Sequence, residues 1–249
     1  MLPNHLIIAG AQKSGTTSLH HTVASHPDVE SAVSPETHDN VKEIQFFTRE
    51  WHRGLNWYFS HYSRERLTID TTPEYLCSPS AISRLAHVFP ASRYIVTLRD
   101  PVQRAVSQYN HYSQDFENTS SFDWRAPGGT LLDNVLGEIA RPFDDWRGLI
   151  GKGLYFEQLA YLRQQIPRSQ LLVLIMEEWS AQPQSTVDTL GDFLGVDSSQ
   201  FTWIVSHQRP HTTTDPKSDP LALKLLHEIF QPSSDRLRSM LNNDIGAWI

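Results

Sequence analysis

Residues 5–23 read HLIIAGAQKSGTTSLHHTV, and this stretch decides the fold class of the chain. The apolar run His5–Ala9 predicts a strand buried on both faces, and Thr16–Ser25 predicts the helix that follows it. The turn between them contains Gly10 and Gly15, and it aims several backbone N–H groups at one point beside a helix N-terminus. Such a turn attracts phosphate or sulfate. We therefore expect a P-loop-like strand–loop–helix unit at the start of an α/β fold.

The turn also carries side chains that suit an anion. Lys13 supplies a full positive charge, Thr16 and Thr17 supply hydroxyl donors, and Gly15 lets the backbone approach the anion closely. The spacing of Gly10 and Gly15 matches a nucleotide-binding P-loop, but Thr16 stands where a kinase-type loop has its lysine. This departure disfavours a Mg-nucleotide site, and a P-loop kinase-like phosphotransferase is kept as an alternative.

Apolar runs alternate with helical patterns along the rest of the chain, as they do in parallel α/β folds. The further expected strands are Leu67–Asp70, Arg93–Leu98 and Leu171–Ile175, and the further expected helices are Ser80–Val88, Val102–Tyr112, Tyr155–Gln165, Pro183–Leu194 and Pro220–Phe230. Val29–Asn56 and Gln114–Gly153 are expected to be irregular excursions that wall a binding site. The prediction is a single domain over residues 1–249, with a parallel sheet flanked by helices on both faces.

The composition excludes several classes of protein. The 28 Asp and Glu residues outnumber the 21 Lys and Arg residues, and the net charge of −7 disfavours nucleic acid and anionic membranes as partners. The lone Cys77 excludes an internal disulfide framework and a cysteine zinc cluster. No apolar run approaches the roughly 18 residues of a membrane span, and the N-terminus lacks a signal-peptide pattern. We expect a cytoplasmic protein that acts on a small molecule, and the sequence leaves its oligomeric state open.

A second candidate anion site follows the predicted strand Arg93–Leu98. Arg99 comes directly after this strand, Asp100 precedes a proline that opens a helix, and Ser107 lies about two turns further on. Open α/β sheets bind ligands at the carboxyl ends of their strands, and a guanidinium suits a bidentate phosphate contact. The alternative interpretation is an ion pair between Arg99 and Asp100 or a neighbouring carboxylate.

Together the two segments resemble the sulfotransferase superfamily, and the order of further motifs is most similar to its heparan-sulfate type. These motifs are SHPDV (25–29), KEIQFF (42–47), GLNWYFSHY (54–62), TPEYLCSP (72–79) and GLYFEQLAYL (153–162). The likeness covers most of residues 5–196 and fades past Phe201. It implies an enzyme that moves a sulfonyl group from 3′-phosphoadenosine 5′-phosphosulfate (PAPS) to an acceptor and releases 3′,5′-ADP, without a metal.

The resemblance also implies roles for individual residues. The loop holds the 5′-phosphate, Lys13 contacts the transferred sulfonate and is catalytic, and Arg99 with Ser107 binds the 3′-phosphate. The residues expected to bind the cofactor are Lys13, Ser14, Gly15, Thr16, Thr17, Arg99 and Ser107.

In KEIQFF the resemblance places the general base at Glu43. A partly desolvated carboxylate can accept a hydroxyl proton, and Phe46 and Phe47 are expected to supply the apolar surroundings. The alternative is that Glu43 only pairs with Lys42 or a nearby arginine. His38, in the same excursion, is the rival base, because cytosolic members of the superfamily use histidine.

The acceptor site is expected to include His38 and Asp70, since Asp70 matches an acidic family position. The next family position is usually lysine and is Thr71 here, which disfavours a polyanionic sugar. The acidic, aromatic-rich stretch 114–153 suits a small cationic natural product, such as a guanidinium alkaloid of the saxitoxin kind. Sulfation of a carbohydrate and a non-catalytic nucleotide-binding module stay open. No pair of histidines has convincing metal spacing, so no metal site is expected.

Overall fold

The computed structural model describes residues 5–63, 65–118, 129–140, 148–206, 219–241 and 248, without the side chains of 114–118. The chain forms two compact units. The first unit comprises Met1–Leu98 and Ala160–His207, and the second comprises Arg99–Leu159 and Gln208–Ile249. The expected single domain over residues 1–249 stays a prediction, and each unit is described by itself below.

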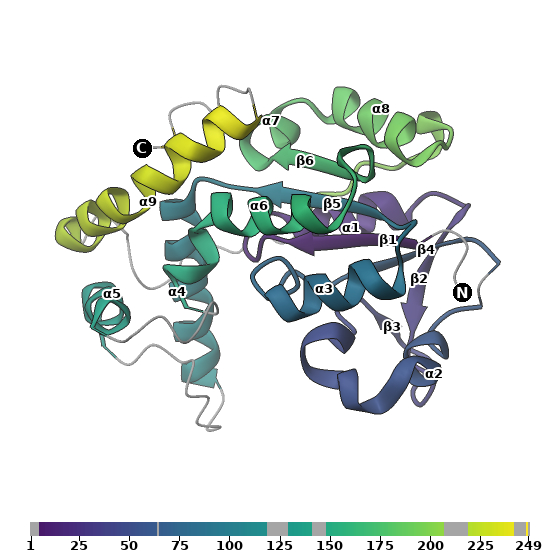
Figure 1. Ribbon diagram of the computed structural model, residues 1–249, viewed down its shortest axis with the longest axis horizontal. Coiled ribbons are helices and arrows are strands. Elements are labelled where there is room, and N and C mark those ends of the chain that lie inside the picture. The colour runs from purple at the N-terminus through teal and green to yellow at the C-terminus, as the bar shows by residue number, and fades with distance from the viewer. Residues whose placement is uncertain are drawn as a thin grey trace. The chain divides into compact units, whose positions relative to one another are not determined.

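A six-stranded sheet forms the centre of the first unit, with the strand order β3-β2-β4-β1-β5-β6 (Figure 1). Its strands are β1 (His5–Gly10), β2 (Val29–Val33), β3 (Asn40–Val41), β4 (Leu67–Thr71), β5 (Arg93–Leu98) and β6 (Leu171–Ile175). All neighbouring strands are parallel except β2 and β3, which pair antiparallel at the edge. Every residue of β1 and β4 is buried, including the polar Thr68, Asp70 and Thr71 of β4, as expected for parallel strands that are covered on both faces.

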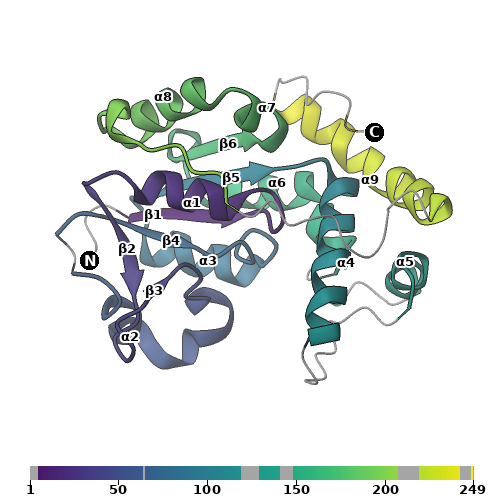
Figure 2. The ribbon, with the colours of Figure 1, turned by 180° about the vertical axis from the view of Figure 1, so that it is seen from behind.

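Helices cover both faces of this sheet. In the first unit these are α1 (Thr16–Ala24), α2 (Gly54–Phe59), α3 (Pro79–Val88), α7 (Met176–Ala181) and α8 (Pro183–Leu194), and α6 (Tyr155–Gln165) belongs to both units. α1 and α8 share one core with β1, β4 and β5. α3 lies on the opposite face of the sheet from α1, as the two views show (Figures 1 and 2). The predicted α/β fold with a P-loop-like sheet between helices is confirmed.

The second unit is helical. It contains α4 (Pro101–Asn118), α5 (Leu131–Ile139), α9 (Pro220–Leu241) and the first part of α6. Asp100 caps the N-terminus of α4: its Oδ1 accepts hydrogen bonds from the backbone N–H groups of Val102 and Gln103 at 2.8 and 2.9 Å. Buried side chains of α4, α5 and α9 pack into one apolar core around Phe230.

The elements expected from the sequence agree closely with the structure in the apolar segments. The predictions for β5, β6, α6 and α8 match to the residue, and β1 and β4 each extend one residue further than expected. α4 continues to Asn118 and α9 continues through Pro232 to Leu241. Short π and 3-10 turns, which were not predicted, occur at Phe46–Glu50, Trp51–Arg53, Gly151–Gly153, Arg168–Gln170 and Ser198–Gln200.

The expectation that 29–56 and 114–153 are irregular was wrong in part. β2, β3 and α2 lie in or begin within the first stretch, and the end of α4 and all of α5 lie in the second. β2 is half polar because it lies near the edge of the sheet, so its sequence, VESAV, carries no continuous apolar run. Residues 119–128 and 141–147 of the second stretch lie outside the described residues.

Candidate active site

The loop between β1 and α1 has the form that its glycines predict. Lys13 and Gly15 adopt left-handed backbone angles, with φ of 67° and 79°. A Cβ atom on Gly15 would lie 2.4 Å from the ring of Trp179, so both the backbone angle and the close packing require glycine at this position. The Ala11 N–H donates to the carbonyl oxygen of Thr97 at 2.7 Å, which ties the loop to β5.

Two features of this loop fit an anion. In the described part of the chain α1 has no side-chain cap hydrogen bond and no acidic residue in its first turn, so its N-terminus is left to interact with an anion. Ser14 is fully buried, and its Oγ has no hydrogen-bond partner among the residues that the structure describes. A buried hydroxyl of this kind needs a partner, and a phosphate or sulfate oxygen in the loop would supply one.

Two buried hydrogen bonds of the Thr97 hydroxyl, called the brace below, hold the loop in place. The Thr97 hydroxyl donates to the carbonyl oxygen of Ser14 at 2.9 Å and accepts from the Trp179 indole N–H at 2.8 Å. Thr97 lies on β5 and Trp179 on α7, so the backbone of the loop at Ser14 is held by two other elements of the first unit. Neither residue was expected at the site, because no short-range motif marks them.

Glu43 is connected through Lys42 to α1, the helix that follows the loop. The ammonium of Lys42 lies 2.8 Å from Oε1 of Glu43 and donates to the hydroxyl of Thr17 in α1 at 2.9 Å. The Glu43 side chain is 33% exposed, so it is accessible to a substrate and partly shielded from water. Phe46 and Phe47, expected to provide apolar surroundings, are both fully buried. The pairing of Glu43 with Lys42, weighed above as the alternative, therefore exists, and through Lys42 it connects the carboxylate to the first turn of α1.

Asp70 lies at the end of β4 and is completely buried. Its Oδ2 accepts hydrogen bonds from the hydroxyls of Tyr58 and Tyr75 at 3.0 and 2.9 Å, and its Oδ1 accepts from Thr72 at 2.8 Å. Burial, together with a smaller effect of the nearby charge of Glu43, raises the pKa of Asp70 to about 6, against the lowering effect of these three hydroxyls. Asp70 thus accepts hydrogen bonds from three hydroxyls inside the protein, and none of its side chain is exposed to solvent.

The residue after Asp70 contacts a buried histidine. The hydroxyl of Thr71, where the family usually has lysine, lies 2.8 Å from Nδ1 of His20. Burial, aided by the charges of His21 and Lys42, lowers the pKa of His20 to about 4, so this ring is neutral at physiological pH. His20 therefore packs as a neutral hydrogen-bonding group, and it does not add the cation that Thr71 leaves out.

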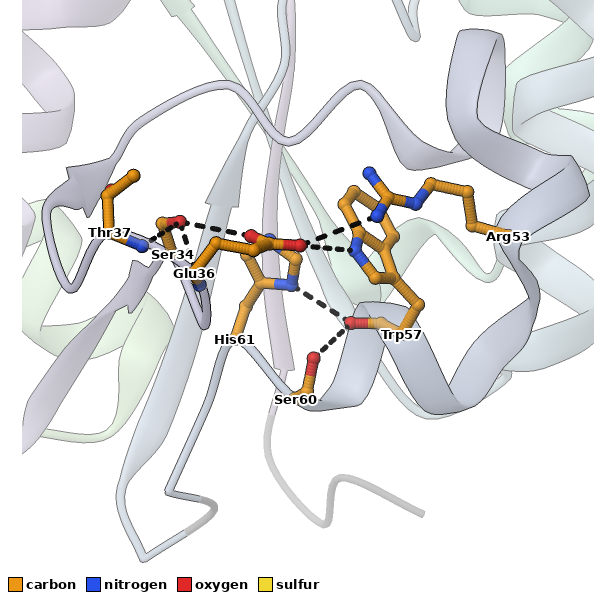
Figure 3. A network of polar contacts seen from close by, with 7 residues as sticks. All are labelled: Ser34, Glu36, Thr37, Arg53, Trp57, Ser60 and His61. Atoms are coloured by element: carbon orange, nitrogen blue, oxygen red, sulfur yellow. Dashed lines mark hydrogen bonds and ion pairs between the residues drawn. The ribbon is translucent and has the colours of Figure 1, made fainter.

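His38 lies on the turn between β2 and β3, where its side chain is exposed and its φ is 61°. The turn is held by a network of polar contacts around Glu36. This carboxylate lies 3.4 Å from Arg53 and accepts from the Trp57 indole N–H at 3.5 Å, as Figure 3 shows. The Arg53 guanidinium also lies 4.1 Å from the centre of the Trp57 ring. These contacts fasten the turn to α2, and the role of His38 as an acceptor residue or rival base stays a prediction.

The predicted 3′-phosphate residues belong to the second unit. Arg99 directly follows β5 in the chain and is half-buried, and its carbonyl oxygen accepts a hydrogen bond from the Tyr155 hydroxyl at 3.0 Å. Ser107 lies on α4 and is half-buried. The loop, Glu43 and Asp70 all lie in the first unit, so the assignment of Arg99 and Ser107 to the same donor stays a prediction.

Within the described parts of the chain there is no group of three metal-ligating side chains. No helix among the described residues has the length and apolar character that crossing a membrane requires.

Comparison with curated proteins gives relatives in eukaryotes. The chain is 31% identical over 201 residues to the heparan sulfate glucosamine 3-O-sulfotransferase 3B1 of Mus musculus, covering 78% of this chain and 46% of that protein. It is 25% identical over 323 residues to the membrane-associated sulfotransferase kil1 of Dictyostelium discoideum, covering 98% of this chain and 66% of that protein. This chain thus spans about half to two thirds of the length of these relatives.

Comparison with solved structures gives bacterial neighbours. A sulfotransferase from Alicyclobacillus acidocaldarius has a TM-score of 0.72 and 25% identity, with 98% of each chain covered. The sulfotransferase STF1 of Mycobacterium tuberculosis shares the fold at a TM-score of 0.61 and 15% identity, over 92% of this chain and 76% of that one. The family model described as sulfotransferase domain matches residues 3–226. This match confirms the resemblance carried by the loop and the KEIQFF motif: the chain belongs to the sulfotransferase domain family.

Proposed function

We propose that this protein transfers the sulfonyl group of PAPS to a hydroxyl or amine of a small acceptor molecule. Family membership supports the reaction class. The observation that carries the proposal is the buried hydroxyl of Ser14, which has no hydrogen-bond partner among the described residues, in a loop before the uncapped helix α1. The carboxylate of Glu43 is connected to the first turn of the same helix through Lys42.

The donor would be held by the loop. Backbone N–H groups at the start of α1 and the hydroxyls of Ser14, Thr16 and Thr17 would bind its 5′-phosphate, and Lys13 would contact the sulfonate. Arg99 and Ser107 would bind the 3′-phosphate, as the family resemblance implies. In the reaction the acceptor oxygen or nitrogen forms a bond to sulfur while the bond between sulfur and the phosphate oxygen breaks. The electron pair of that bond goes to the phosphate of 3′,5′-ADP, and Lys13 with the loop N–H groups stabilises the charge that develops there.

Glu43 would act as the general base. The acceptor loses a proton as it attacks, and the carboxylate of Glu43 takes that proton. Its partial exposure suits this role, because a base must meet the acceptor yet remain partly desolvated. Asp70 is buried under three hydroxyl donors, so its role at the acceptor site is to hold Tyr58, Tyr75 and Thr72 in place.

For the acceptor we favour a small molecule, in part cationic, such as a guanidinium alkaloid. Thr71 in place of a lysine supports this choice, since a polyanion lacks that cation as a partner. Sulfation of a carbohydrate is the second candidate, because several relatives bear the name heparan sulfate glucosamine 3-O-sulfotransferase. Natural-product tailoring and a cytoplasmic location both remain predictions.

Two measurements test the function. Calorimetry with 3′,5′-ADP should show binding that Lys13→Ala weakens, and Lys224→Met serves as a control because Lys224 is 72% exposed on α9. A screen of small alcohols, amines and oligosaccharides with PAPS, read as a mass increase of the acceptor, should identify the substrate class. Turnover should persist in EDTA. Turnover that stops in EDTA and returns with Mg²⁺, with ATP as the donor, would support the phosphotransferase instead, and nucleotide binding with no product from any acceptor would support a binding module.

A further inference from the structure

Lys42 makes three contacts that join separate parts of the first unit. Its backbone carbonyl oxygen accepts a hydrogen bond from the N–H of Thr71 at 3.3 Å, which fixes its main chain at the end of β4. Its ammonium donates to Thr17 at 2.9 Å and lies 2.8 Å from Glu43. One residue thus touches the end of a central strand, the first turn of the phosphate-binding helix and the proposed base.

These contacts differ from those of an ordinary surface ion pair. Exposed pairs contribute little, because water and side-chain entropy oppose them. The Lys42 side chain is only 23% exposed, and its charge acts on the buried ring of His20, whose pKa it helps to lower. The ammonium is therefore held in a partly desolvated position, where its hydrogen bonds constrain their partners.

The contact with Thr17 sets the direction of a hydroxyl proton. A threonine hydroxyl has one proton to donate and can accept at its oxygen. Because Thr17 Oγ1 accepts from the Lys42 ammonium, its own proton points to another acceptor. Thr17 lies in the first turn of α1, where the proposed donor phosphate would bind, so the ammonium prepares this hydroxyl as a donor to that phosphate.

The contact with Glu43 fixes the carboxylate relative to the same helix. Glu43 follows β3 in a segment without regular secondary structure, so its backbone is not held by a strand or helix. Two neighbouring contacts hold the segment against β4 and the residue after it: the carbonyl of Lys42 with Thr71, and the N–H of Gln45 with Thr72 Oγ1 at 3.3 Å. The side chain of Glu43 is then directed by the ammonium.

We propose that Lys42 is a positioning residue that couples donor binding to proton acceptance, by holding the Thr17 hydroxyl and the Glu43 carboxylate with one ammonium group. This inference rests on the proposed function, since it needs a phosphate at α1 and a base at Glu43. It extends that function by making the geometry of the base depend on the helix that binds the donor.

A double-mutant cycle on nucleotide binding tests the donor side. Calorimetry with 3′,5′-ADP is done on wild type, Lys42→Met, Thr17→Val and the double variant, with Lys42→Arg as the conservative change and Lys224→Met as the matched control. We expect each single variant to raise Kd about fivefold, the double variant to raise it no more than the larger single effect, and Lys42→Arg to stay within about twofold of wild type. Melting temperatures show that every variant is folded.

Kinetics with an acceptor from the screen test the base side. Thr17→Val should weaken donor binding, Glu43→Gln should lower kcat and leave donor binding unchanged, and Lys42→Met should both weaken donor binding and lower kcat. A merely structural lysine would lower the melting temperature without this combination.

The outcomes separate the inference from the function. Additive effects in the cycle, or a Lys42→Met variant with wild-type Kd and kcat, would overturn the role of Lys42 while leaving the sulfotransferase function intact. If wild type fails to bind 3′,5′-ADP, the proposed function is wrong and the inference falls with it.

Discussion

Replacing Thr97 by valine should lower the free energy of unfolding. The two buried hydrogen bonds of the Thr97 hydroxyl allow the size of this effect to be estimated. Valine keeps the shape of threonine but removes the hydroxyl that donates to Ser14 and accepts from Trp179. Both partners are buried, so a carbonyl oxygen and an indole N–H lose their hydrogen bonds without gaining water. Each buried, unsatisfied group costs about 1–3 kcal/mol, which gives about 2–6 kcal/mol for the pair. In a chain of this size, even 2 kcal/mol lowers the melting temperature by about 4–8 °C.

The matched control is Thr97→Ser, which keeps the hydroxyl and removes one methyl group. This loss costs about 1 kcal/mol, or about 2–4 °C. Melting followed by circular dichroism compares the two variants with wild type. Calorimetry with 3′,5′-ADP should also show a Kd about fivefold weaker for Thr97→Val, because the carbonyl of Ser14 is no longer fixed. A valine variant as stable as the serine variant would show that the brace does not hold the loop.

Three further results are expected. Glu43→Gln should lower kcat by about 10²–10⁴-fold with 3′,5′-ADP affinity unchanged, whereas His38→Ala keeps near-normal turnover; the reverse pattern in steady-state kinetics would make histidine the base. Arg99→Ala should weaken 3′,5′-ADP binding by about 2 kcal/mol, and Ser107→Ala by about 1 kcal/mol, in calorimetry; unchanged affinity in Arg99→Ala would remove the 3′-phosphate assignment. The folded-state pKa of Asp70, about 6, lies above its unfolded value of 3.8, so the folded state binds this proton more tightly. The stabilisation that the proton provides, about 3 kcal/mol, is therefore lost as the pH rises from about 4 to 6. Asp70→Asn should flatten this part of the melting temperature against pH profile, and a profile parallel to wild type would place the titration elsewhere.

The apolar elements were predictable from the sequence because an apolar run leaves a local signal, even in the edge strand β6, where four of the five residues are half-buried. β6 is a continuous apolar run and β5 is mostly apolar, and α8 begins at a proline and is followed by Gly195, so their limits could be placed to the residue. β2 has no such signal, since polar Glu30 and Ser31 interrupt it and three of its five residues are only half-buried. α9 passes through Pro232, a residue expected to end a helix, and buried Phe230 and Leu237 on either side show that packing continues past it.

The candidate site was predictable only where it lies within one motif. The glycine spacing and Lys13 predicted the phosphate loop, and the resemblance supplied Glu43. The hydrogen bonds of Thr97 and the contact of Lys42 with Thr17 join distant parts of the chain. Trp179 and Thr97 are 82 residues apart, and Lys42 and Thr17 are 25 residues apart. Local propensity carries no record of such pairs. The pairing of Lys42 with Glu43 lies within KEIQFF and was weighed from the sequence, but the contact of Lys42 with Thr17 was not.

The position of β1 inside the sheet has a consequence for how the proposed sulfotransferase could change its acceptor. β1 is paired on both sides, by β4 and β5, and all its residues are buried, so its amides should exchange with solvent only when the whole unit unfolds. The turn around Glu36 and His38 is held by exposed polar contacts, which open at far lower cost. The proposed donor loop therefore extends from a buried strand that is paired on both sides, while the turn that carries His38 should accept substitutions with little effect on that loop. Such a division lets new acceptor preferences arise by mutation while recognition of the nucleotide is preserved.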